Sequence, residues 1–213
     1  DRLDLLAADD DAASELVEQM RAYRLDLQDI PEHSPLLRAF DYSPCSVCPV
    51  LDLARPVPGK LAKNLRQARR VMGEHELFSD DSPEHLPALF ELHKRQWQER
   101  GETGVLDNTQ LVDFHLRASA GFSRAGMLRL HVLKVGARTA GVLYGFARNG
   151  RMHYYLSGYD PQLERFSPGS LLIEHAIEHA RAAGDRDFDF LRGSEPYKYR
   201  WGAVDRPQFR ISS

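Results

Sequence analysis

The stretch from Leu128 to Tyr159 reads LRLHVLKVGARTAGVLYGFARNGRMHYYLSGY, and it decides the fold class. Its apolar residues alternate or run together in three segments, a pattern typical of β-strands: 128–135, 139–148 and 152–159. Val135-Gly136-Ala137-Arg138 separates the first two segments, and Asn149-Gly150 separates the last two. Asn-Gly between apolar alternations is a strong signal for a tight hairpin. The stretch therefore predicts a three-stranded antiparallel meander.

A helix and two strands are expected after the meander. Ser167-Pro168-Gly169 combines a capping residue with a proline in the first helical turn, and the helical pattern runs to Ala183 before Gly184. Strand patterns follow at 187–191 and 207–213. This order predicts an α/β fold with a mixed, mostly antiparallel sheet and flanking helices.

Three helices are expected before the meander. The first, at 60–72, has an apolar stripe and five positive charges without an acid: Lys60, Lys63, Arg66, Arg69 and Arg70. Such a face is typical either of a phosphate-binding surface or of a solvated one. The second helix begins at Ser82-Pro83-Glu84 and runs to Gly101, and the third begins at Asp107 or Asn108 and runs to about Arg124.

The first part of the chain predicts a helix at 12–24, a strand at 23–30 and then a proline-rich connector with short elements at most. We expect a boundary near residue 45, with an N-terminal segment at 1–45 and the main domain at 46–213. Cys45 and Cys48 form a C-x-x-C pair in this connector, where we expect two reduced thiols in a loop because a zinc site needs two further ligands.

Bulk composition narrows the class of protein. The chain has 213 residues, 42% of them hydrophobic and 28% charged, as in ordinary globular proteins. A net charge of −3 argues against a DNA-coating protein. No apolar run approaches the roughly 20 residues of a membrane span, and the acidic start is unlike a signal peptide, so we expect a cytoplasmic location. His175 and His179 have metal-ligand spacing but no evident third ligand, so we expect a solvated helix flank and no metal.

The start of the helix at Pro168 is the best candidate for an anion site. A helix N-terminus presents backbone N–H groups and a partial positive charge, which suit a pyrophosphate. The residues that would surround it are Arg165, Ser167, Gly169, Ser170 and Leu171. The alternative is that Ser167 only caps the helix.

Three segments give the sequence a resemblance to a known family: YYLSGYDP at 154–161, SPG at 167–169 and FDFLRGSEPYKYRWG at 188–202. They resemble the GNAT-like acetyltransferase domain of the CelD-type cellulose-biosynthesis proteins. A weaker likeness extends back through Leu92-His93 and Trp97 to the basic helix, so it covers about residues 50–213. One departure is that the phosphate loop has one glycine and a proline, where the family's loop is usually glycine-rich.

The resemblance implies a GNAT-like fold and an N-acyltransferase that moves an acyl group from acetyl-CoA, or another acyl-CoA, to an amine. The acceptor would be a small molecule, with a sugar or cell-surface polysaccharide precursor as a candidate. The donor's pantetheine would lie between splayed strands at 152–159 and 187–191, with its phosphates at the Ser167 helix.

The resemblance also suggests catalytic roles. Backbone N–H groups near Leu156 and Ser157 would stabilise the oxyanion. Tyr197 would protonate the leaving thiolate, Asp189 or Glu195 would act as base, and Lys198 would stabilise charge. His93 and Trp97 are candidate acceptor contacts. Structural roles are the alternative: Asp189 facing solvent, and Tyr197, His93 and Trp97 packing in the core.

The segment YKYRWG at 197–202 is also similar to the F-K-x-x-F-G ending of Fem-type peptidyl transferases. Two alternatives follow: an aminoacyl-tRNA-dependent transferase, for which tRNA would be a partner, and a non-catalytic GNAT-like binding domain. Fem-type proteins carry two GNAT-like halves. This likeness implies that residues 12–30 are the closing helix and strand of an upstream half, and the start at Asp1 without a methionine is consistent with it.

Overall fold

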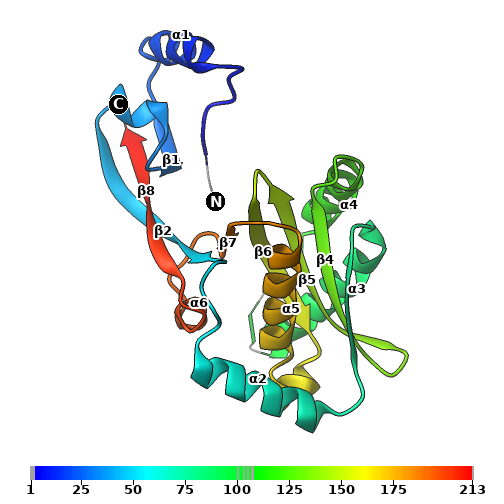
Figure 1. Cartoon of the computed structure of the whole chain (residues 1–213). Coiled ribbons are helices and arrows are strands. Elements are labelled where there is room, and N and C mark those ends of the chain that lie inside the picture. The colour runs from blue at the N-terminus through cyan, green and yellow to red at the C-terminus, as the bar shows by residue number, and fades with distance from the viewer. Residues whose placement is uncertain (1–2, 100, 103, 105, 107, 213) are drawn as a thin grey trace. The chain divides into compact units, whose positions relative to one another are not determined.

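The structure, a computed structural model, describes residues 3–99, 101, 102, 104, 106 and 108–212 (Figure 1). The chain divides into two compact units. The larger unit is Asp52–Asp189, and the smaller unit combines Asp1–Leu51 with Phe190–Ser213. Each unit has its own strands and helices.

The larger unit is built on five strands in the order β7-β6-β5-β4-β3. All neighbours are antiparallel except β6 and β7, which are parallel. The strands are β3 (Glu76–Asp80), β4 (Leu128–Val135), β5 (Arg138–Arg148), β6 (Arg151–Tyr159) and β7 (Asp187–Asp189). The predicted meander is therefore confirmed. Asn149 and Gly150 both have positive φ, at 54° and 75°, as a two-residue type I′ hairpin requires.

The predicted helices of this unit are also present. They are α2 (Gly59–Met72), α3 (Leu86–Glu99) after the 3₁₀ turn η2 (Pro83–His85), α4 (Thr109–Arg124), and α5 (Pro168–Ala182) after the 3₁₀ turn η4 (Pro161–Phe166). The side chains of Ser82 and Asn108 accept backbone hydrogen bonds from the turns they open. Asp107, the other expected start of α4, lies outside the described residues. Across the described segments, no helix is both long and apolar enough to cross a membrane.

Two glycines define which helices cover each face of this sheet. A Cβ on Gly141 would lie 2.9 Å from Leu172 of α5, and a Cβ on Gly158 would lie 2.7 Å from the backbone nitrogen of His93 in α3. Because Gly158 pairs with Val142, the neighbour of Gly141, the two glycines face opposite sides. Thus α5 covers one face, and α3 covers the other.

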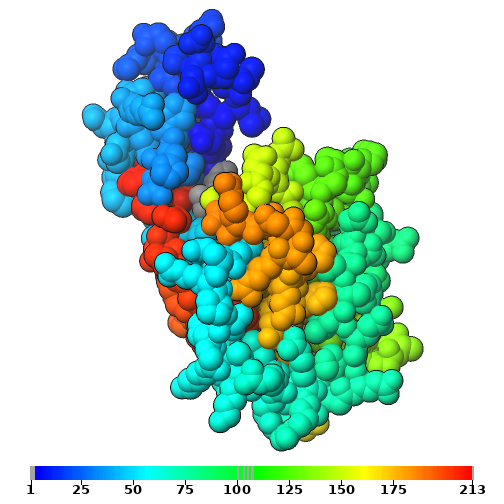
Figure 2. All heavy atoms as spheres, viewed as in Figure 1, coloured from blue at the N-terminus to red at the C-terminus, as the bar shows by residue number. Residues whose placement is uncertain are grey.

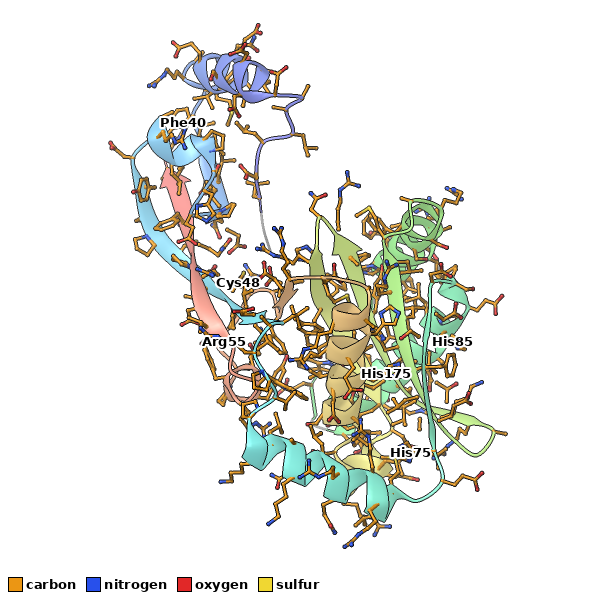
Figure 3. All side chains as sticks on the ribbon, in the orientation of Figure 1. Phe40, Cys48, Arg55, His75, His85 and His175 are labelled. Carbon is orange, nitrogen blue, oxygen red and sulfur yellow. The ribbon has the colours of Figure 1, made fainter. Side chains whose placement is uncertain are left out.

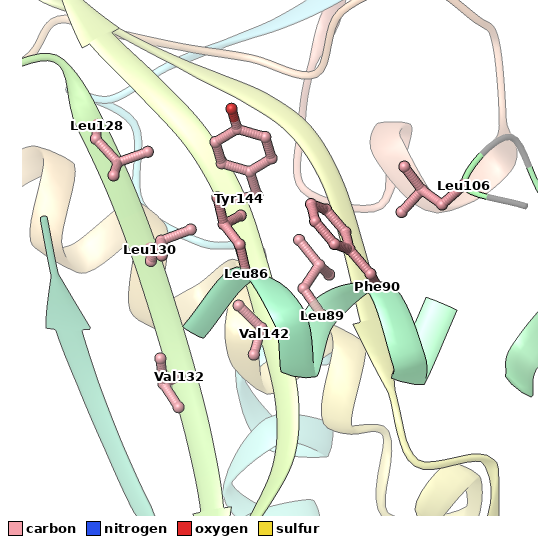
Figure 4. Packing of buried hydrophobic residues seen from close by; sticks show 9 residues of the cluster. All are labelled: Leu86, Leu89, Phe90, Leu106, Leu128, Leu130, Val132, Val142 and Tyr144. Atoms are coloured by element: carbon pink, nitrogen blue, oxygen red, sulfur yellow. The ribbon is translucent and has the colours of Figure 1, made fainter. Parts of the chain in front are cut away.

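A hydrophobic core cluster of the larger unit lies on the α3 face (Figure 4). Leu86, Leu89 and Phe90 extend from α3 onto the strands. They meet residues of β4 and β5 that are buried: Leu128, Leu130, Val132, Val142 and Tyr144. Spacing of i, i+3 and i+4 on the helix and alternation on the strands explain how both elements bury one side.

The smaller unit contains the antiparallel strands β1 (Asp26–Pro31), β8 (Val204–Ser212) and β2 (Tyr42–Asp52), with β8 in the middle. Its helices are α1 (Asp10–Met20), the 3₁₀ turn η1 (Pro35–Arg38) and the one-turn α6 (Pro196–Tyr199). A small core of Val17, Ile30, Leu36 and Ile211 joins α1, η1 and the strands. The origin of this segment in an upstream half stays a prediction.

The expectation of a loop around the C-x-x-C pair is wrong. Cys45 and Cys48 lie inside β2, both as free thiols, with Cys45 exposed and Cys48 buried (Figure 3). Proline disfavours strands because it lacks an N–H, but the register of β2 against β8 shifts between Pro44 and Ser46. An irregular ladder therefore accommodates the prolines.

Two strand ends also differ from the prediction. The strand expected at 187–191 ends at Asp189, and Leu191 has a left-handed backbone with φ 56°. The last strand begins at Val204, before the expected Pro207. The short strand β3 was not predicted, because five residues give too little alternation to identify.

Candidate active site

The parallel pairing between β6 and β7 ends before β6 does. The paired residues are Arg151↔Asp187, Met152↔Phe188 and His153↔Asp189, whereas β6 continues to Tyr159. On its other side, β6 has a β-bulge against β5: Tyr144 faces Leu156 and Gly145 faces Tyr154, so Tyr155 is the extra residue. The end of the β7 ladder and the bulge thus lie next to each other on β6.

His153 and Asp189 form the last rung of this ladder and are also in side-chain contact. His153 Nδ1 lies 3.7 Å from Asp189 Oδ2. The Asp189 side chain is fully buried, and that of His153 is 26% exposed. The alternative that Asp189 faces solvent is therefore wrong. Sequence reasoning missed His153, because its partner is brought to it only by the strand register.

Leu156 and Ser157, the expected oxyanion residues, directly follow the bulge. The Tyr154 hydroxyl lies 2.7 Å from the Ser157 hydroxyl, which ties the two sides of the bulge together. Farther along, the backbone N–H of Tyr159 donates to Gln96 Oε1 of α3 at 3.0 Å. A helix side chain, rather than a strand, thus receives the N–H at this end of β6.

The start of α5 has an unusual conformation for a capped helix. Ser167 occupies the N-cap with φ 54° and ψ 48°, and its side chain makes no capping hydrogen bond. Its carbonyl accepts from the N–H groups of Ser170 and Leu171 at 3.0 and 3.1 Å. Left-handed backbone in a residue other than glycine is costly and is concentrated at functional sites. The Ser167 hydroxyl is exposed and not used as a cap.

The other expected residues of this loop have different surroundings. Gly169 packs against Tyr159, whose Cε1 would be 3.2 Å from an added Cβ, so the glycine allows strand and helix to approach. The Leu171 side chain is fully buried in the core. The Arg165 guanidinium lies 4.6 Å above the Phe166 ring and is exposed. Of the set, Arg165 and Ser167 are the exposed side chains.

His93 and Trp97 contact each other on α3. Trp97 Nε1 donates to His93 Nε2 at 2.8 Å, so the imidazole proton is on Nδ1. His93 is buried, and its backbone packs against Gly158 of β6. This arrangement supports a packing role for the pair at the β6–α3 contact.

Glu195, Tyr197 and Lys198 belong to the smaller unit. The Lys198 ammonium is buried and donates to the carbonyls of Leu191, Arg192 and Gly193 at 3.3, 2.9 and 3.0 Å. It also lies 2.8 Å from Glu195 Oε2. Burial alone would raise the pKa of the Glu195 carboxyl, but hydrogen bonds from Lys198 and from the residue's own backbone outweigh it, and the pKa is lowered. Tyr197 packs edge-on against Phe190, with ring centroids 6.3 Å apart.

A histidine cluster lies between α5 and the sheet, and it corrects the expectation of a solvated flank. His175, marked in Figure 3, and His179 pack against the fully buried His131 of β4, with ring centroids 5.6 and 5.3 Å away. The Ser79 hydroxyl lies 2.9 Å from His131 Nδ1 and 3.1 Å from His175 Nε2. Within the described part of the chain, no group of three His, Cys, Asp or Glu residues is arranged to hold a metal ion.

Acid is expected to destabilise the protein through this cluster. Burial, followed by repulsion from His175, His179 and Arg129, holds the pKa of His131 well below 6.5. In the unfolded chain His131 therefore binds a proton near pH 6.5, whereas in the folded chain it does not. The free energy of unfolding falls as the pH drops below that value. His131 alone contributes a slope of up to about 1.4 kcal/mol per pH unit.

Urea unfolding at pH 7.5 and pH 5.5 tests this expectation. His131→Asn should lose less stability on acidification than the wild type, whereas His33→Asn, a change at an exposed histidine, should leave the difference unchanged. Glu178 and Asp185 act in the opposite direction on the flanking histidines, whose pKa values are nevertheless lowered by burial. Equal acid sensitivity of wild type and His131→Asn would contradict the assignment.

The basic helix α2, in the cyan part of the surface in Figure 2, has four exposed basic side chains: Lys60, Lys63, Arg66 and Arg70. Lys63, Asn64, Arg66, Gln67 and Arg70 line a shallow groove on this helix. Arg69, also on α2, does not line this groove. Its Nη2 lies 2.8 Å from Oε2 of the buried Glu174 on α5. Arg69 thus anchors the helix, and Lys63, Arg66 and Arg70 form an exposed cationic face.

Comparisons with known proteins agree with this architecture. The sequence model of the acetyltransferase (GNAT) domain matches residues 59–199. No curated protein matches the sequence. Among solved structures, FemX has a TM-score of 0.68 at 10% identity, over 95% of this chain and 75% of that one. L-PGS from Bacillus licheniformis has a TM-score of 0.66 at 13% identity, over 94% and 72%. At these identities the similarity is one of fold.

Proposed function

The chain belongs to the acetyltransferase (GNAT) domain family, and from this premise we propose that it is an N-acyltransferase that moves an acyl group from acyl-CoA to an amine. The mixed α/β, GNAT-like fold expected from the sequence is confirmed. The CelD-type relationship stays a proposal, and so does a sugar or polysaccharide precursor as the acceptor. The family itself supports acyl transfer as the reaction class.

The observation that carries the proposal is the early end of the β6–β7 ladder beside the Tyr155 bulge. The pantetheine arm of acyl-CoA contains amide groups, and an extended amide chain can pair with a strand edge as a peptide does. The part of β6 beyond the ladder, residues 155–158, is our candidate for such an edge. The helix α5 follows β6 after η4, so its N-terminus is a suitable place for the donor's pyrophosphate.

The reaction needs a neutral amine nucleophile, a hydrogen-bond donor for the oxyanion and a proton for the leaving thiolate. The amine nitrogen attacks the thioester carbon, and the carbonyl oxygen becomes an oxyanion. Backbone N–H groups at Leu156 and Ser157 are our candidates to stabilise it. The C–S bond breaks, and the leaving thiolate takes a proton; the sequence-based candidate for this donor, Tyr197, stays a prediction. The base role expected for Glu195 stays a prediction, and the contacts of Lys198 favour a structural role.

Calorimetric titration with acetyl-CoA tests the donor site. Arg165→Ala should weaken binding roughly tenfold, because a charge-assisted hydrogen bond to phosphate contributes about 1.5 kcal/mol. Ser170→Ala should have a smaller effect. Arg117→Ala removes a second arginine, on α4, whose Nε donates to the Asp113 carbonyl, and should leave the affinity unchanged.

The second candidate function is an aminoacyl-tRNA-dependent transfer, and the cationic face of α2 favours it. Lys63, Arg66 and Arg70 repeat along one helix side without a carboxylate among them, as contacts to successive phosphates require. If the folded chain fails to bind acetyl-CoA but binds tRNA in a salt-sensitive manner, this candidate replaces the first. If neither ligand binds, the non-catalytic alternative gains support.

A further inference from the structure

We propose that His153 is the catalytic base of the acyl transfer and that Asp189 is its positioning residue. The proposal rests on the proposed acyl-CoA reaction and adds to it a residue that the sequence did not reveal. It begins from the contact between His153 Nδ1 and Asp189 Oδ2, 3.7 Å apart, at the last rung of the β6–β7 ladder.

The burial of the two side chains assigns them different roles. Asp189 has no exposed surface, so it cannot meet an amine that arrives from solvent. A buried carboxylate is costly unless it is paired, and across the ladder Asp189 contacts the His153 imidazole. His153 is 26% exposed, which leaves its imidazole accessible. Asp189 can therefore orient and charge-stabilise an imidazole that itself reaches the substrate.

The preceding pair on the same side of β6 and β7, Arg151 and Asp187, is already matched in charge. Arg151 and Asp187 precede them by two residues on the same side of the two strands, and they form their own ion pair at 2.8 Å. The Arg151 guanidinium binds Asp187 through two nitrogens, at 3.2 and 2.8 Å. Arg151 thus neutralises Asp187, and the titratable imidazole faces Asp189.

The position of His153 fits the reacting centre of the proposed enzyme. The ladder ends at this rung, and the Tyr155 bulge lies two residues farther along β6. A donor arm that pairs with β6 beyond the ladder would bring its thioester toward the end of that ladder. The base would then lie beside the carbon that the amine attacks, as general-base catalysis requires.

With Nδ1 toward Asp189, Nε2 of neutral His153 accepts the proton that the amine nitrogen loses as the N–C bond forms. Asp189 stabilises the imidazolium, which returns the proton to solvent. The C–S bond breaks, the thiolate is protonated, and one amide and one thiol result. A separation of 3.7 Å is long for a hydrogen bond, but catalytic hydrogen bonds often tighten only in the substrate complex.

The first test needs no acceptor. We would follow imidazole nitrogen signals by NMR in the full chain at one pH, with and without acetyl-CoA. Asp189→Asn should shift the Nδ1 signal of His153, because it removes the adjacent carboxylate. Acetyl-CoA should shift the His153 signal and leave that of exposed His33 in place. An unchanged His153 signal in Asp189→Asn would overturn the pairing.

The second test measures turnover as thiol release from acetyl-CoA with water or glucosamine as the acceptor probe. His153→Ala should lower the rate about 100-fold, as loss of a general base does, and added imidazole should restore part of it. Calorimetric affinity for acetyl-CoA should stay at the wild-type value. If the variant binds acetyl-CoA and releases thiol at the wild-type rate, the inference fails and the proposed function stands. If the wild type does not bind acetyl-CoA, the proposed function fails first.

Discussion

Gly158→Ala is expected to destabilise the larger unit by about 3 kcal/mol, the upper end of the usual cost of overpacking. The new Cβ would lie 2.7 Å from the His93 nitrogen, 3.0 Å from the Leu89 carbonyl oxygen and 3.1 Å from the His93 Cα. All three atoms are helix backbone, so no side chain can turn away to make room. Relief requires α3 to move off β6.

Thermal unfolding checks this result. A loss of about 3 kcal/mol corresponds to a drop in Tm of roughly 10 °C for a chain of this size. The matched control is Gly121→Ala in α4, where an added Cβ has no atom within 4 Å. That change should stabilise the protein by about 0.5 to 1 kcal/mol, because alanine favours a helix more than glycine. A Gly158→Ala protein as stable as the wild type would mean that α3 packs more loosely than described.

The displacement of α3 should also affect the proposed site. Gln96 of α3 accepts the Tyr159 N–H, so α3 supports the end of β6 where the donor would bind. Acetyl-CoA affinity should therefore fall with Gly158→Ala even at temperatures where the protein stays folded. Gly121→Ala should leave it unchanged, because its position makes no such contact.

Local patterns predicted the elements whose geometry depends on nearby residues. Asn149-Gly150 fixed a hairpin, because both residues can adopt positive φ. Pro168 and Gly184 marked the ends of α5 for similarly local reasons. The strand at Tyr42–Asp52 could not be predicted in this way. Its prolines argue against a strand, and pairing with the distant strand β8 in an irregular register stabilises it.

In the candidate site, too, the sequence predicted local features, whereas long-range contacts became visible only in the structure. The helix start at Ser167 was visible in the sequence, but its left-handed backbone and missing side-chain cap were not. Asp189 was a candidate base from the resemblance, yet its burial and its contact with His153 follow from the register of two strands far apart in the chain. Parallel pairing has no local sequence signal, which is why His153 was missed.

Lys198→Met is expected to destabilise the smaller unit by about 3 kcal/mol. Methionine keeps the apolar stem but removes the ammonium, and the carbonyls of Leu191, Arg192 and Gly193 would lose a shared donor in a buried place. A buried polar group without a partner costs about 1 to 3 kcal/mol. The same turn also holds Leu191 and Gly193 at φ 56° and 112°, so the ammonium stabilises a strained backbone.

Denaturant unfolding and limited proteolysis at the 191–195 turn would measure the effect. Glu195→Gln is the matched control, because its carboxylate is 54% exposed and an ion pair of that kind contributes about 0 to 1 kcal/mol. If Lys198 is structural, Lys198→Met should greatly reduce the stability and Glu195→Gln should reduce it little. If Lys198 is catalytic, Lys198→Met should keep nearly native stability and greatly reduce turnover. Because three carbonyls and one carboxylate already surround the ammonium, an anionic transition state would have to displace them, and we expect the stability effect to dominate.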